Sequence, residues 1–137
     1  MPDKETLQKA KKDLREGKSP TTAAGEFVRE EIDHIREGKH GARSTKQAIA
    51  IGLSKARRAG VPLKPPRKGE TSARTRRSAT RAYEVGQGKR KPKASSRKRS
   101  RGMLRALQRE PHRVVSRRAL SAQAKRAARR RQSRSSK

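Results

Sequence analysis

The chain has 137 residues, with 41 Lys and Arg against 12 Asp and Glu, which gives a formal net charge of +29 at pH 7. Leu, Ile, Val and Phe together number 17, about 12% of the residues. A strongly charged sequence with so few large apolar side chains is expected to be largely disordered, which excludes one conventional globular domain over the whole length.

Charge and apolar residues are distributed in opposite ways along the chain. Residues 1–40 contain nine basic and nine acidic side chains, whereas residues 41–137 contain 32 basic and three acidic ones. Of the 17 large apolar residues, 11 lie before residue 64. We therefore predict a helical unit in residues 1–63, a basic linker in residues 64–101 and a basic arm in residues 102–137.

Two helices are predicted in the first forty residues. Leu7, Ala10 and Leu14 share one helical face and indicate a helix at about residues 4–16. Ser19 followed by Pro20 is typical of a helix start and begins a second helix at about residues 20–37.

A third helix, at about residues 45–59, has the clearest start signal. Ser44 and Gln47 have capping-box spacing, in which the Ser44 hydroxyl accepts from the Gln47 N–H and the Gln47 side chain accepts from the Ser44 N–H. The short connection after the second helix predicts an antiparallel hairpin. Gly52, on the packed face, allows the two helices to approach closely.

The rest of the chain is predicted to be mostly disordered. We expect a short helix at residues 72–84 within the linker and latent helices at 102–110 and 116–131 in the arm. Like charges at this density oppose helix formation, so the free arm is expected to gain helix only when a polyanion neutralises it. The predicted fold class is mainly α, a small N-terminal helical hairpin unit followed by a largely disordered basic arm.

No residue pattern supports catalysis or a cofactor. Cys is absent, which excludes disulfides and thiolate metal sites, and no apolar run of ten residues suggests a membrane span or a signal-peptide core. Glu30 and His34 lie one helical turn apart, and we expect them on the ordinary solvated face of an amphipathic helix. We predict no enzyme activity, no metal site, no cofactor and no small-molecule substrate.

The basic residues predict a polyanionic partner. Duplex DNA carries about one negative charge per 1.7 Å and releases condensed counterions when Lys and Arg neutralise its phosphates. With one Phe, one Tyr and no Trp, the chain lacks the side chains that stack on bases, which favours phosphate contacts over sequence readout. The predicted function is sequence-independent DNA binding by a histone-like protein.

The candidate contact residues are cations in both parts of the chain, together with one serine. One interpretation is an anion pocket where Lys39, His40, Arg43 and Lys46 surround the start of the third helix, since the helix dipole is positive there. The alternative is that Ser44 and Gln47 only cap each other and these cations are solvated. The full predicted set is Lys39, His40, Arg43, Ser44, Lys46, Arg57, Arg58, Arg76, Arg77, Lys89, Arg90, Lys91, Lys93, Arg97, Lys98, Arg99, Lys125, Arg126, Arg129, Arg130 and Arg131.

Residues 46–60, KQAIAIGLSKARRAG, carry a resemblance to known proteins. With residues 27–31, 38–41 and 75–79, this segment resembles a family of small, very basic bacterial proteins of unknown function that are loosely described as DNA-binding. The basic tail is also similar in texture to linker-histone-type tails of bacterial proteins. The resemblance implies a bacterial origin and supplies no reaction. From the lack of a membrane span or signal-peptide core, together with the predicted DNA partner, we expect a cytoplasmic, nucleoid-associated protein.

Two other functions are compatible with the same residues. Small basic chains also bind ribosomal or other structured RNA, and competition between duplex DNA and ribosomal RNA separates the two partners. A stress-related protein on an anionic membrane surface is the second alternative. It fits less well, because the basic segments lack the Trp, Phe and Leu anchors of such helices.

Overall fold

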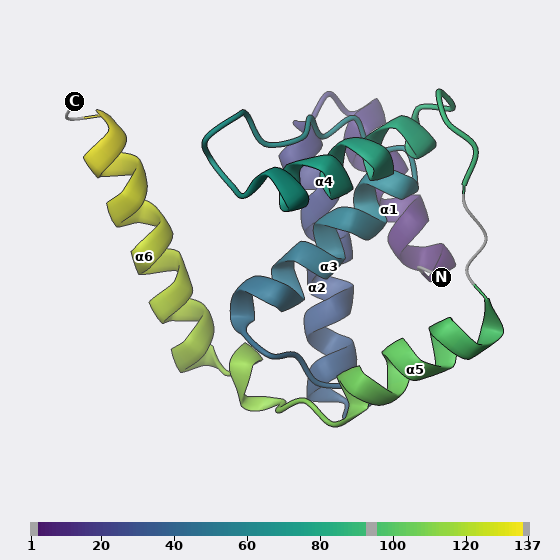
Figure 1. Cartoon of the computed structure of the whole chain (residues 1–137). Helices are drawn as coiled ribbons and strands as arrows, with labels where there is room; N and C mark the ends of the chain where they lie inside the picture. The colour runs from purple at the N-terminus through teal and green to yellow at the C-terminus, as the bar shows by residue number, and fades with distance from the viewer. Residues whose placement is uncertain (1–2, 93–95, 136–137) are drawn as a thin grey trace. The chain divides into compact units, whose positions relative to one another are not determined.

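The computed structural model describes residues 3–92 and 96–135. Within these ranges the chain is helical, apart from loops and one isolated bridge between Lys68 and Thr71 (Figure 1). It divides into two compact units, unit 1 with residues 1–31 and 50–95 and unit 2 with residues 32–49 and 96–137. The elements are α1 (Lys4–Arg15), α2 (Pro20–Arg36), α3 (Thr45–Arg58), α4 (Ala73–Gly86), α5 (Arg97–Gln108), the 3-10 helix η1 (Arg113–Val115) and α6 (Arg117–Ser135).

The expectation of a largely disordered arm is wrong. The helices α1, α2 and α3 each end one residue before the predicted end, and α4, α5, η1 and α6 occupy most of residues 73–135. Serine hydroxyls stabilise the starts of the last three α-helices by accepting a backbone N–H three residues ahead: Ser72 from Thr75 at 3.2 Å, Ser96 from Arg99 at 3.1 Å and Ser116 from Ala119 at 3.1 Å.

The core of unit 1 is built mainly from small side chains. Phe27 and Ala24 of α2 are fully buried with Ala56 of α3, and Leu7 and Leu53 pack against them. As predicted, Gly52 allows α2 and α3 to approach closely. A Cβ at this position would lie 2.6 Å from the Val28 Cα.

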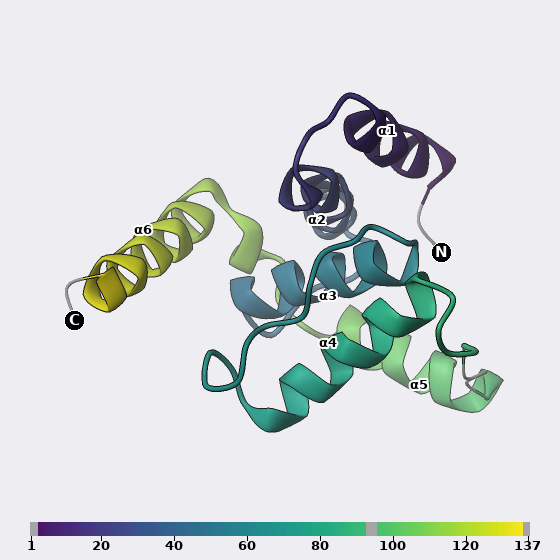
Figure 2. The ribbon, with the colours of Figure 1, turned by 90° about the horizontal axis from the view of Figure 1, so that it is seen from above.

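Helix α4 belongs to unit 1 and packs beside the second half of α3 (Figure 2). Ala79 and Ala82 are its buried residues. The Gln87 side chain donates to the Gly60 carbonyl at 3.2 Å, which joins the C-terminal ends of α4 and α3. Gly86 is required at this contact, since a Cβ there would lie 1.7 Å from the Arg57 carbonyl oxygen.

The core of unit 2 joins the α2–α3 connection to the C-terminal third of the chain. Val115 is 1% exposed and lies in one apolar cluster with Ile35, Ala42 and Ala48. Backbone hydrogen bonds support this contact, for example from the Ala42 N–H to the carbonyl of residue 111 at 3.0 Å. The burial of Val115 therefore anchors this part of the expected arm to the α2–α3 connection.

Gly41 should be essential for unit 2, because a Cβ there would lie 1.9 Å from the Glu110 carbonyl oxygen. We expect Gly41→Ala to lower the free energy of unfolding by about 1–3 kcal/mol, the usual cost of overpacking. Gly102→Ala is the matched control, since a Cβ there meets nothing within 4 Å and Ala favours the interior of α5 by about 0.5–1 kcal/mol. Urea denaturation measures both variants. Equal stability of the two would contradict the close contact.

Candidate nucleic-acid interface

Hydrogen bonds made by the side chains of Ser44, Thr45 and Gln47 stabilise the start of α3. The Ser44 hydroxyl accepts from the Gln47 N–H at 3.1 Å, as predicted. The Gln47 side chain accepts from the Arg43 N–H at 2.6 Å, not from the predicted Ser44 N–H. Thr45 is 6% exposed, and its hydroxyl donates to the Val114 carbonyl, which connects this helix start to the C-terminal segment.

A cavity of about 470 Å³ opens at this helix start within unit 2. The first residues of α3 form one side of it and one face of α6 forms the other. Its charged lining consists of Lys46, Arg126, Arg129 and Arg130, with no acidic side chain. Ser44, Thr45 and Gln123 complete the lining.

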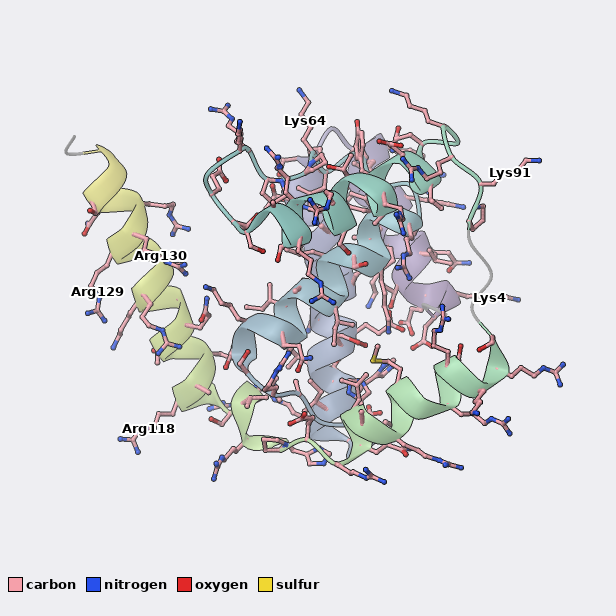
Figure 3. The ribbon with its side chains drawn as sticks, viewed as in Figure 1. Lys4, Lys64, Lys91, Arg118, Arg129 and Arg130 are labelled. Atoms are coloured by element: carbon pink, nitrogen blue, oxygen red, sulfur yellow. The ribbon has the colours of Figure 1, made fainter. Side chains whose placement is uncertain are left out.

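Helix α6 supplies most of this positive charge. Its 19 residues include eight Arg and Lys and no Asp or Glu, over a length of about 28 Å. The helix packs against η1, and the half-buried residues Leu120, Gln123 and Ala127 recur at helical spacing. Arg118, Arg129 and Arg130 are exposed on α6 (Figure 3).

The electrostatics of the cavity favour an anion. Four cations line it, and the first-turn amides of α3 add the positive end of a helix dipole. The Arg126 guanidinium donates to the Gln123 side-chain oxygen at 3.4 Å. This neutral partner leaves the charge of Arg126 uncompensated. An arrangement of guanidinium groups and helix amides binds phosphate oxygens well and offers nothing to a metal cation.

Three residues predicted to surround the helix start do not line the cavity. The Lys39 ammonium lies 3.3 Å from a carboxylate oxygen of Glu37, so it is paired. His40 is only 8% exposed, and its Nδ1 lies 2.9 Å from the Gly41 carbonyl oxygen. Arg43 is exposed, outside the residues that line the cavity.

Arg57, another predicted contact residue, is buried and hydrogen-bonded to backbone carbonyls. It is 8% exposed, and its guanidinium donates to the carbonyls of Leu63 at 3.1 Å and Lys64 at 3.3 Å. Burial lowers the pKa of Arg57 from its ordinary value. The neighbouring Arg58 is exposed.

The other predicted residues are spread over both units. Arg76, Arg77 and Arg90 line a different cavity, in unit 1. Lys93 lies outside the described residues. The remaining predicted cations are exposed and line neither cavity: Lys89, Lys91, Arg97, Lys98, Arg99, Lys125 and Arg131.

Sequence reasoning missed two polar residues of the α3–α6 cavity, Thr45 and Gln123. Gln123, Arg126 and Arg130 follow one another at spacings of three and four residues, which places them on one face of a helix. That spacing indicates a shared face. It does not indicate that the face lies opposite Thr45, because the two sides of the cavity are about 80 residues apart in the sequence.

Comparison with known proteins finds a match to one family model, and the function of that family is unknown. Residues 4–69 match the model of a family of unknown function, DUF6496. The match covers just under half of the chain and includes the α3 start, but not α6. No curated protein and no solved structure matches the chain. In the part that the structure describes, no helix is both long and apolar enough to cross a membrane.

The Thr45 hydroxyl should stabilise the side of the cavity that contains the α3 start. We expect Thr45→Val to lower the free energy of unfolding by about 1–3 kcal/mol, because it removes the donor to the Val114 carbonyl. Thr45→Ser keeps the hydroxyl and should retain most of that stability. Urea denaturation of the full chain measures both, and equal destabilisation would show that the methyl group matters instead of the hydrogen bond.

Proposed function

We propose that this protein binds duplex DNA without sequence preference, through contacts to the phosphate backbone. The observation that carries the proposal is the cavity of unit 2, where Lys46 and three arginines of α6 gather beside the start of α3. DNA binding of this kind agrees with the net charge of +29. In a bacterial cell such a protein would belong to the nucleoid.

The dimensions and charge of α6 support a duplex partner. An exposed helix about 28 Å long spans several phosphates of each strand, and the major groove of DNA admits an α-helix. Because α6 contains no acidic residue, it meets no repulsion from the phosphates at any point along its length. Phosphate contacts of this kind fix position and orientation on the duplex and carry no sequence information.

The aromatic residues favour backbone contacts over base contacts. Phe27 is fully buried in the core of unit 1 and Tyr83 is half-buried on α4. Neither is placed as an exposed platform for base stacking, which single-strand and sequence-specific RNA modules use. Guanidinium groups, in contrast, match phosphate oxygens in a bidentate manner.

The α3–α6 cavity should contribute more to DNA binding than other charges of the same helix. We expect Arg126→Gln with Arg130→Gln to weaken binding about equally for unrelated duplex sequences. The log–log salt slope should fall in magnitude by roughly 0.9 for each phosphate that the variant no longer neutralises. Fluorescence anisotropy of the full chain at several salt concentrations measures both quantities.

Arg117→Gln with Arg118→Gln is the matched control, because both residues are exposed on α6 and lie outside the cavity lining. The control removes the same charge and should have the smaller effect. Equal effects would mean that α6 acts only as diffuse positive charge. Competition with ribosomal RNA identifies the preferred polymer, and preference for RNA at equal salt would contradict the proposal.

The division into two units shows that the full chain, and not a fragment, is the suitable molecule for binding experiments. Unit 1 takes residues from both sides of residue 64, and so does unit 2. A fragment of residues 64–137 would therefore lack the whole apolar cluster of unit 1 and three of the four buried residues of the unit 2 cluster, Ile35, Ala42 and Ala48. Binding should be measured on the full chain with substitutions in place of truncations.

A further inference from the structure

We propose that unit 1 carries a second binding site for phosphoryl groups, separate from the α3–α6 cavity. This site is a cavity of about 490 Å³ lined by Lys68, Arg76, Arg77, Arg81 and Arg90, with Thr80 among them. This inference rests on the proposed function where the ligand is a nucleic acid. It deepens that function by giving each chain two phosphate-binding sites.

Three separate segments bring these cations together. Arg77 and Arg81 lie one helical turn apart on α4, and Arg76 is half-buried beside them. Lys68 comes from the preceding loop, where Gly69 has a φ of 93° and a bridge joins Lys68 to Thr71. Such a turn needs a glycine, so the loop geometry is built into the sequence.

Arg90 reaches the cavity from the segment that follows α4. Its Nε lies 3.0 Å from a carboxylate oxygen of Glu84, which fixes the guanidinium near the helix. Glu84 itself does not line the cavity, and no acidic residue does. Five cations thus share one concave surface without an acid in its lining.

Helix α4 presents this cationic face in a fixed orientation. Ala79 and Ala82 are buried against unit 1, and Gly86 fits closely against the Arg57 carbonyl. The Thr80 hydroxyl donates to the Arg76 carbonyl at 2.9 Å, within the same helix. The arginines therefore converge on one place as a consequence of how the helix packs.

The chemistry of the lining selects phosphoryl groups. Guanidinium forks bind phosphate oxygens in pairs, and several of them together suit an anion with two or more charges. No aromatic side chain lines the cavity, so it offers no stacking surface for a base. The ligand is either a stretch of nucleic-acid backbone or a free oligophosphate, and both present the same oxygens.

The test uses the full chain and inorganic tripolyphosphate. Arg77→Gln with Arg81→Gln should lower tripolyphosphate affinity at one site by about tenfold or more, since each charge-assisted hydrogen bond that is removed has a large effect. Arg67→Gln with Arg74→Gln is the matched control, because both residues are exposed in the same region and outside the cavity lining. It should change that affinity less than about twofold. Isothermal titration calorimetry gives affinity and stoichiometry.

A charge-preserving variant separates site geometry from charge. Arg77→Lys with Arg81→Lys keeps the charge and removes the forks, so its affinity should fall between those of the wild type and the Gln variant. Far-UV circular dichroism verifies that the helices remain. An equal fall in affinity in the cavity and control variants, or full affinity in the Gln variant, would overturn the second site.

Duplex DNA distinguishes the two sources of phosphate. If the backbone occupies the cavity, Arg77→Gln with Arg81→Gln also lowers the salt slope of DNA binding by roughly 0.9 for each phosphate left without its arginine. An unchanged slope together with abolished tripolyphosphate binding identifies a free oligophosphate as the ligand. Failure of the wild type to bind DNA would contradict the proposed function alone, because tripolyphosphate binding to unit 1 would still be observed.

Discussion

The close passage of residues 110–115 over the α2–α3 connection is the contact on which unit 2 depends. Gly41 has no side chain, so the Glu110 carbonyl can lie where a Cβ would be. Val115 then reaches the apolar cluster around Ile35 and Ala48. Because α6 begins two residues later, this one packing contact also brings its arginines to the start of α3.

A chain with so few large apolar residues folds here by using alanine as its main core residue. Ala10, Ala23, Ala24, Ala56 and Ala82 are all buried. Alanine has the highest helix propensity and lets helices approach closely, although it buries little area of its own. Opposite the buried alanines, the long stems of Lys and Arg can lie along the helices while their charges stay in water.

The two cavities show that the ability of a basic residue to bind an anion depends on its position in the fold. Lys39 and Arg57 carry the same formal charge as Arg77 and Arg130, but Lys39 is paired with Glu37 and Arg57 donates to backbone carbonyls. A cation contributes to an anion site where it lines a cavity together with other cations and no acidic side chain, which Lys39 and Arg57 do not. Charge density along the sequence does not report that condition.

The sequence by itself determined the first three helices, the Ser44 cap and the approach at Gly52, because caps, periodicity and small residues act within a few neighbouring positions. It also located helices near α4, α5 and α6, but composition led to the wrong expectation that they stay unfolded. The tertiary structure decided that outcome, since Val115 is buried by residues about 70 to 80 positions away. It likewise decided which cations converge, because the cavity linings join segments that no local pattern connects.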